Sequence, residues 1–226
     1  SNTNKRSYTA EEKKEIVENY LKEKYNEEFI VYLRIGKDWG QNYDRFYAYP
    51  KGGDKEKDSF AIRFFLRDDG TYDLSDGYFA VIIKDEYEKA IGEFVKEIYK
   101  DFKVYTDTRR GIVFSENLNK DTKLSEIYEK DKDYYSFTTV LVKESEAKEK
   151  SIEESLKKIA EKMEEAKLFG ELKMVIIHDD RFDEIEWGNG TLNMDEDVVK
   201  YGIKYIYIDT YDGISEVKDS GLWRTK

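Results

Sequence analysis

The stretch YDRFYAYP, residues 43–50, holds four aromatic rings, one arginine and the chain's only proline. Its apolar positions Phe46 and Ala48 alternate with tyrosine and arginine, and such a period of two predicts a β-strand. One face of this strand is then apolar and points to a core. The opposite face carries Tyr43, Arg45, Tyr47 and Tyr49.

Two neighbouring stretches repeat this alternation and extend the predicted sheet. Residues 29–35, FIVYLRI, and residues 60–67, FAIRFFLR, each place an apolar side chain at every second position. We expect Leu33 and Ile35 to face the same core as Phe46. The opposite face is then predicted to gather arginines and rings from all three strands: Tyr32, Arg34, Tyr43, Arg45, Tyr47, Arg63, Phe65 and Arg67.

This predicted arginine and tyrosine face has two interpretations. The chain has nine arginines, and four of them are expected here, although lysine and glutamate are far commoner in it. In a structural interpretation, the guanidinium groups stack on cross-strand rings, or later parts of the chain cover the face. In a functional interpretation, the face binds an anionic or aromatic partner, such as an envelope polymer or another protein. Trp39, in the loop GKDWGQN, is either an anchor at the rim of this face or a plug in its own loop.

Helix signals open the chain and recur twice. The spacing of a capping box, in which glutamate stands three positions after the capping residue, predicts helices after Thr9, Asp85 and Ser151. Asp69-Gly70 predicts a hairpin into a fourth strand over residues 71–83, and further strands are expected near 110–115 and after each later helix. We therefore predict an α+β fold of amphipathic helices, each followed by antiparallel strands in a helix-plus-curled-sheet unit. Hairpin-scale connections argue against a doubly wound parallel sheet.

The domain organisation is predicted from the positions at which a new helix begins. Residues 1–8 are interpreted as the scar of a cleaved tag and a polar tether. Residues 9–144 form a helix-plus-antiparallel-sheet region with two helix-strand units. Residues 145–226 form a third unit, which is either separate or packed with the first region as one domain.

The composition excludes several classes of protein. The net charge of −11 disfavours a partner that presents a phosphate backbone, because nucleic-acid binding uses clustered, uncompensated Lys and Arg. No stretch is long and apolar enough for a membrane span. The chain has no cysteine, so we expect neither disulfides nor Cys-ligated zinc.

Candidate catalytic groups are sparse. The only histidine, His178, precedes Asp179 and Asp180, which would suit a metal-dependent or carboxylate-based hydrolase. Acidic clusters around residues 68–76 and 195–197 do not match the spacing of a calcium loop. Nucleophile, phosphate-loop and dinucleotide motifs are missing from the sequence. We therefore expect no catalytic residue, no metal site and no cofactor, and keep a hydrolase that uses the acidic loop after His178 as the alternative.

The blocks EIVENYLKEKYNEEF, KDWGQNYDRFYAYPKGGD and DDGTYDLSDGYFAVIIKDEYEKAI resemble a family of small Gram-positive cell-envelope lipoproteins of unknown function. The resemblance covers roughly residues 10–100. Members have a cleaved signal peptide, a lipidated cysteine, a charged tether and an ectodomain that opens with a helix and antiparallel strands. The element order also resembles cystatin-like and PepSY-like folds, in which a helix crosses a curled sheet. The resemblance implies an extracytoplasmic protein that reaches the membrane only through an N-terminal lipid anchor.

The sequence as a whole predicts a non-catalytic binding or interaction module displayed outside the cytoplasmic membrane. Its partner is expected to be an unknown protein or an envelope polymer, and not a nucleic acid. A purely structural or inhibitory module, with the arginine and tyrosine face buried, is the third alternative.

Overall fold

The computed structural model of the protein describes residues 7–148, 150–188, 191–192, 199 and 203–220. The chain divides into two compact units. Unit 1 comprises Ser1–Ile82 and Arg109–Thr122, and unit 2 comprises Ile83–Thr108 and Lys123–Lys226. Both contain helices and predominantly antiparallel strands, so the predicted α+β class is confirmed.

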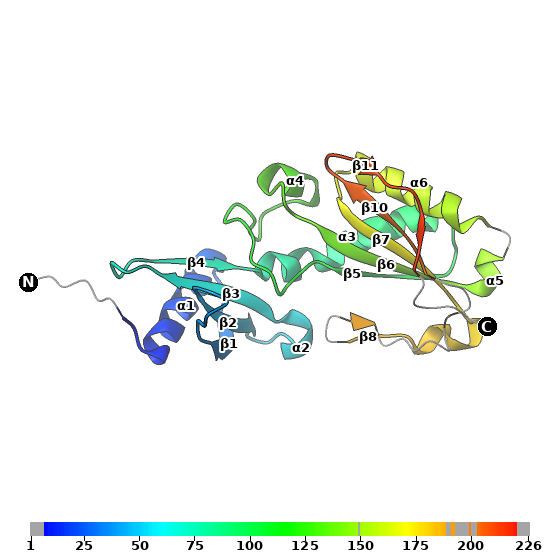
Figure 1. Ribbon diagram of the computed structural model, residues 1–226. Helices are drawn as coiled ribbons and strands as arrows, with labels where there is room; N and C mark the ends of the chain where they lie inside the picture. Colours follow the sequence, from blue (N-terminus) through cyan, green and yellow to red (C-terminus); the bar gives the residue numbers. More distant parts are fainter. Residues whose placement is uncertain (1–6, 149, 189–190, 193–198, 200–202, 221–226) are drawn as a thin grey trace, which may run out of the picture. The chain divides into compact units, whose positions relative to one another are not determined.

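Unit 1 is a helix packed on a four-stranded antiparallel sheet (Figure 1). The strand order β1-β2-β3-β4 follows the sequence, so each strand pairs with the next one along the chain. Gly70, with φ of 89°, forms the predicted turn between the last two strands. The elements are α1 (Ala10–Tyr25), β1 (Phe29–Ile35), β2 (Asp44–Pro50), α2 (Lys55–Asp58), β3 (Phe60–Leu66) and β4 (Tyr72–Asp76).

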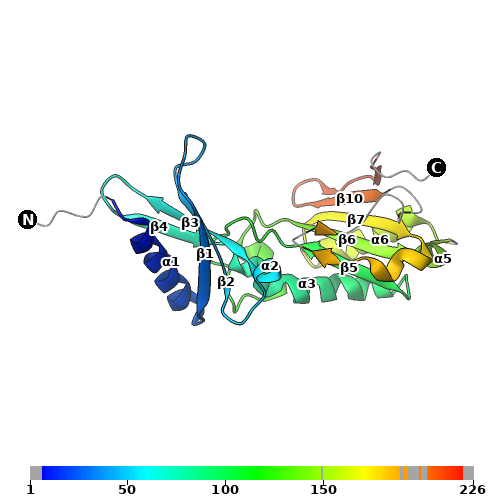
Figure 2. The ribbon, with the colours of Figure 1, turned by 90° about the horizontal axis from the view of Figure 1, so that it is seen from below.

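Helix α1 covers one face of this sheet, which we call the inner face (Figure 2). The predicted capping box is confirmed, since Thr9 accepts a hydrogen bond from the Glu12 amide and Glu12 accepts one from the Thr9 amide. Asn26 ends the helix in the left-handed conformation, with φ of 52°. The core between helix and sheet is rich in rings and consists of Val17, Leu21, Tyr25, Val31, Phe46, Ala48, Phe60, Ile62, Phe64 and Tyr78.

Helix α3 (Tyr78–Lys96) begins at Tyr78 and not at Asp85, so that predicted start is wrong. Strand β4 ends at Asp76, whose carboxylate accepts a hydrogen bond from the Tyr78 amide at 2.9 Å and turns the chain into the helix. A side chain at Gly77 would be blocked, because a Cβ there would lie 2.1 Å from the Ile112 carbonyl oxygen. The sequence did not reveal this turn, because the apolar residues that follow it suit a helix and a strand equally well.

Unit 2 is a six-stranded mixed sheet with α3 and α6 packed together on one face (Figures 1 and 2). Its main path is β11-β10-β7-β6-β5, and β12 also pairs with β10. Tyr99, which follows the end of α3, donates a hydrogen bond to Ser155 of α6. The elements after α3 are β5 (Phe102–Asp107), η1 (Leu124–Glu126), α4 (Ile127–Lys130), β6 (Ser136–Lys143), α5 (Glu144–Ala147), α6 (Ile152–Glu165), β7 (Gly170–Ile177), η2 (Asp179–Glu184), β8 (Trp187–Gly188), β9 (Thr191–Leu192), β10 (Lys204–Asp209), β11 (Gly213–Ile214) and β12 (Lys218–Asp219).

Two sequence predictions fail in this part of the chain. Strands β6 and β7 are parallel, because the helical connection through α5 and α6 lets the chain return in the same direction. This pairing joins residues on both sides of position 144, and both strands belong to unit 2. The strand expected at 110–115 is not formed, and that segment lies instead beside β4, with the Phe114 amide bonded to the Asp76 carbonyl.

The predicted tether is only partly within the described residues. Residues 1–6 lie outside them. Tyr8, by contrast, is packed against the sheet, with its ring centroid 5.9 Å from that of Tyr72 and its hydroxyl bonded to the Gly70 carbonyl. The folded part of unit 1 therefore starts before Thr9.

Candidate functional site

A β-bulge in β1 sets which side chains reach the outer face of the sheet in unit 1. Val31 pairs with Ala48 and Leu33 pairs with Tyr47, so Tyr32 is an extra residue without a partner position on β2. One extra residue shifts the alternation, and every later side chain of β1 changes face. The register predicted from period two holds only as far as the bulge.

Three residues beyond the bulge therefore lie on the face opposite to the predicted one. Leu33 and Ile35 were expected in the core and are instead 46% and 43% exposed on the outer face. Arg34 was expected on the outer face, and this prediction is wrong. It pairs with the buried Phe46, and its guanidinium lies 3.4 Å from the Asp44 carboxylate on the inner side.

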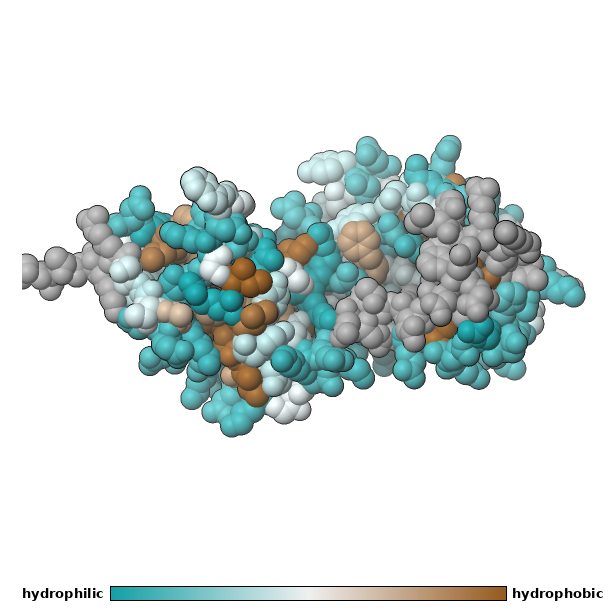
Figure 3. Space-filling view, turned by 60° about the horizontal axis from the view of Figure 1, so that its bottom comes forward, coloured by the Kyte–Doolittle hydropathy of each residue, from teal (hydrophilic) through white to brown (hydrophobic). Residues whose placement is uncertain are grey.

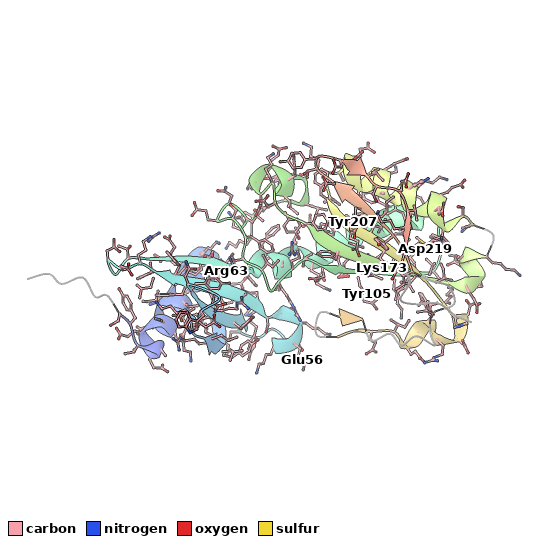
Figure 4. The ribbon with its side chains drawn as sticks, in the orientation of Figure 1. Glu56, Arg63, Tyr105, Lys173, Tyr207 and Asp219 are labelled. Atoms are coloured by element: carbon pink, nitrogen blue, oxygen red, sulfur yellow. The ribbon has the colours of Figure 1, made fainter. Side chains whose placement is uncertain are left out.

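The other predicted residues of the three strands do share the outer face. Arg45 pairs with Arg63, and both alternate with buried positions of their strands, as Tyr47 does on β2. Tyr47 pairs with Ala61, which is itself buried. Figure 4 marks Arg63 on this sheet. We define the outer face by its exposed or half-buried members: Ile30, Tyr32, Leu33, Ile35, Tyr43, Arg45, Tyr47, Tyr49, Arg63, Phe65 and Arg67.

Two arginines converge on one tyrosine of the outer face. The Arg63 guanidinium lies 4.7 Å from the ring centroid of Tyr43, and that of Arg45 lies 5.9 Å from it. Arg45 also donates hydrogen bonds to the hydroxyls of Tyr43 at 3.2 Å and of Tyr47 at 3.4 Å. The hydrogen bond from Arg45, together with the charges of Arg63 and Arg45, lowers the pKa of Tyr43.

Like charges face each other in this cluster. Arg45 and Arg63 are directly opposite residues of an antiparallel pair, an arrangement that is destabilising unless something compensates for it. Among the residues that the structure describes, neither arginine forms an ion pair with a carboxylate. Arg67, at the end of β3, differs, because it pairs with Asp73 and lies over the ring of Phe65. Within the described residues, Arg45 and Arg63 thus contact tyrosines but have no carboxylate partner.

An apolar strip borders these arginines along β1. Ile30 is 39% exposed and lies beside Leu33 and Ile35 on the outer face. Figure 3 shows hydrophobic side chains in a band across this unit. Tyr32 continues the strip, with its ring centroid 5.7 Å from that of Tyr49 and its hydroxyl donating to Ser59 at 3.0 Å. The aliphatic part of the strip was not predicted, because Leu33 and Ile35 reach this face only through the bulge.

Trp39 stands at the tip of the loop between β1 and β2. The loop is closed by the Asp38 and Gln41 bridge, and the Gly40 amide donates to the Asp38 carboxylate at 2.8 Å. The Trp39 side chain is fully exposed, so it does not plug the loop. Of the two interpretations offered by the sequence, this placement fits a residue that is available at the rim.

The acidic groups around His178 lie in unit 2. His178 is 3.6 Å from Glu144, and Asp179 accepts a hydrogen bond from the Ser145 amide at 3.1 Å. Hydrogen bonds from the Ser145 side chain and then from its amide lower the pKa of Asp179. Within the described ranges, no three His, Cys, Asp or Glu side chains lie together as they would around a metal ion. The acidic cluster at 195–197 lies outside those ranges. In the same ranges, no helix has the length and apolar character needed to cross a bilayer.

Comparisons with known proteins identify a structural neighbour but no family. No family model matches the chain, and no curated protein matches it. A solved structure of a DUF5037 family protein from Ruminococcus gnavus is similar, with 19% sequence identity and a TM-score of 0.46. The similarity covers 88% of this chain and 93% of that one. At this level of similarity we draw no conclusion from it about function.

Proposed function

We propose that unit 1 is a non-catalytic binding module that docks an acidic surface of a partner protein on its outer face. One observation carries the proposal: Arg45 and Arg63 oppose each other across two strands, and no carboxylate within the described residues pairs with them. A face that served only structure would gain from an acidic cross-strand partner at one of these positions. A carboxylate supplied by a partner would remove the repulsion and form charge-assisted hydrogen bonds with both guanidinium groups.

The composition of the outer face favours a protein over a small molecule. Small ligands are bound in concave sites that enclose most of their surface. The residues here extend over the broad face of an open sheet and are mainly Arg, Tyr and exposed aliphatic side chains. Tyr, Trp and Arg are the residue types that dominate binding energy in protein interfaces. Trp39, fully exposed at the edge of this surface, adds a further residue of this kind.

The sign of the charge defines the partner's chemistry. The chain carries a net charge of −11, so a partner that was acidic throughout would be repelled at long range. The local excess of arginine therefore selects a partner with an acidic patch set in a mixed or neutral surface. Association should then weaken as salt rises, because exposed charges are screened.

We also propose that the protein acts outside the cytoplasmic membrane as the ectodomain of a lipoprotein, and that unit 1 is cystatin-like. The support for the location is the resemblance of residues 10–100 to envelope lipoproteins, and the support for the fold is a helix across a curled four-stranded sheet. The coding sequence upstream of Ser1 tests the location. A signal peptide with a lipidation cysteine is expected there, and a different protein domain in that place would contradict the proposal.

A peptide selection tests the binding function. A phage-displayed library of random peptides is selected on the wild-type protein, and the affinities of the recovered peptides are measured by fluorescence anisotropy. We expect sequences enriched in Asp and Glu, which lose affinity on the order of a hundredfold when Arg45→Glu and Arg63→Glu are combined. The double reversal keeps two like charges opposite each other, so it preserves the charge relation within the sheet. Lys22→Glu, on the solvent side of α1, is the matched control and should bind as the wild type does.

Two results would overturn this function. Recovered peptides that are not acidic, or that bind the double variant as tightly as the wild type, would show that the arginines do not recognise the partner. Inorganic polyphosphate that binds the wild type more tightly than any selected peptide would identify an anionic polymer, and not a protein, as the ligand.

A further inference from the structure

A small depression lies beside the bulge in β1, at the edge of the sheet in unit 1. Its volume is about 130 Å³, and α1 and β1 form its two sides. Val31 and Phe46, both buried, belong to its lining, as do Ala10 and Leu33. We call this depression the socket.

The bulge and the start of α1 explain why the socket exists. Tyr32 is the extra residue of β1, and it locally bends the strand. The facing residue of α1 is Ala10, the first residue of the helix, whose methyl group leaves room where most side chains would fill it. A continuous, unbulged strand facing a larger residue would close this space.

The size of the socket limits what it can hold. Pockets for small molecules usually measure about 300–1,000 Å³. An apolar cavity of about 150 Å³ holds one benzene molecule. The socket, at about 130 Å³, therefore fits one leucine-sized or phenylalanine-sized side chain.

The socket is continuous with the outer face. Tyr32 and Leu33 line the socket and also belong to the outer face. The rim carries Lys14 and Glu11, together with Arg34, which is paired with Asp44, so the rim charges are nearly balanced and the apolar lining decides what the socket accepts. A partner segment that crosses the edge of β1 from the outer face would reach the socket with its next apolar residue.

We propose that the socket receives one aliphatic or aromatic anchor side chain of the same acidic partner protein that docks on the outer face. This inference rests on the proposed function and adds the kind of segment that is recognised: a carboxylate for Arg45 and Arg63, and a single apolar residue for the socket. Buried anchors in small pockets supply a large share of the affinity in many interfaces. Burial of a leucine-sized side chain should strengthen binding by roughly tenfold to a hundredfold.

A variant that fills the socket tests this inference with the same selected peptides. Ala10→Phe places a ring in the socket from a helix terminus, and Asn19→Phe makes a similar increase in size on the exposed side of α1. We expect Ala10→Phe to weaken peptide binding about tenfold or more and Asn19→Phe to leave the affinity unchanged. Replacing the peptide's apolar residue by Ala should weaken its binding to the wild type by the same factor. The same replacement should change its binding to Ala10→Phe little, because that variant has already lost the interaction.

A second readout does not depend on the variant's stability. In the wild-type protein, the methyl resonances of Ala10, Val31 and Leu33 should shift when a selected peptide is added. Methyl resonances that do not shift, or equal affinity for Ala10→Phe and the wild type, would show that the socket does not receive an anchor side chain. If the peptides then still lose affinity for the Arg45→Glu and Arg63→Glu protein, the proposed function stands without it. If they bind all variants equally, both proposals fail.

Discussion

Asp76 offers the sharpest test of how unit 1 is held together. Its side chain is fully buried and accepts four hydrogen bonds. Tyr25 donates at 2.6 Å and the Tyr78 amide at 2.9 Å to one oxygen. Tyr20 donates at 2.7 Å and Lys24 at 2.9 Å to the other. This carboxylate thus ties α1 to the junction of β4 and α3, and Asp76→Ala removes every one of these contacts.

The expected loss of stability in Asp76→Ala follows from the groups that lose their partner. Removing one member of a buried ion pair costs about 3–5 kcal/mol, because the other charge is left without compensation. Each buried hydroxyl that loses its acceptor costs a further amount of about 1–3 kcal/mol. Lys24 is 18% exposed and can turn toward water, which recovers part of the loss. We therefore expect Asp76→Ala to destabilise unit 1 by about 4 kcal/mol.

Asp73→Ala is the matched control on the same strand. Asp73 is also ion-paired, with Arg67, but its side chain is 65% exposed, so its loss should cost less than about 1 kcal/mol. Hydrogen exchange of α1 and β4 peptides in rising urea measures the stability of unit 1 separately from that of unit 2. Equal destabilisation by the two variants, or a loss of under about 1 kcal/mol for Asp76→Ala, would refute the reasoning.

Three further predictions concern stability. Arg63→Ala should change the urea midpoint little, because removal of a like-charge pair offsets the lost contact with the Tyr43 ring; a loss above about 1 kcal/mol would show that this arginine stabilises the fold. Gly77→Ala should lower the melting temperature by several degrees, since its Cβ would lie 2.1 Å from the Ile112 carbonyl oxygen, and an unchanged melting curve would contradict this close approach. Burial and the nearby Asp76 raise the pKa values of Tyr20 and Tyr25, so folding favours their neutral forms. That contribution is complete below the ordinary tyrosine pKa of about 10 and is lost as pH rises beyond it, and a urea midpoint that stays constant up to pH ~12 would contradict it.

The sequence predicted those elements that local chemistry determines. The capping box at Thr9 and the cap at Ser151 were both visible because each depends on neighbouring residues. The pairing order of β1 to β4 followed from short connections. The parallel pair in unit 2 was missed because strand direction depends on where a helical connection returns, which no local pattern records.

The candidate site was predicted only in part, and the bulge is the reason. Period two placed Arg45 and Arg63 correctly on one face, since β2 and β3 are regular. In FIVYLRI, apolar and aromatic residues occupy both sets of alternating positions, so a slip by one residue leaves an apolar face in either register. Arg34 was therefore assigned to the wrong face, and the exposed strip that includes Leu33 was not foreseen.

A charge-swap experiment tests the central claim most directly. A selected acidic peptide and its copy with Asp and Glu replaced by Lys are each titrated into the wild type and into the protein with Arg45→Glu and Arg63→Glu. We predict that the two matched pairs bind and the two mismatched pairs do not, because complementarity on the outer face decides recognition. Failure of the lysine peptide to bind the reversed protein, together with undiminished binding of the acidic peptide to it, would contradict the assignment of this face as the docking surface.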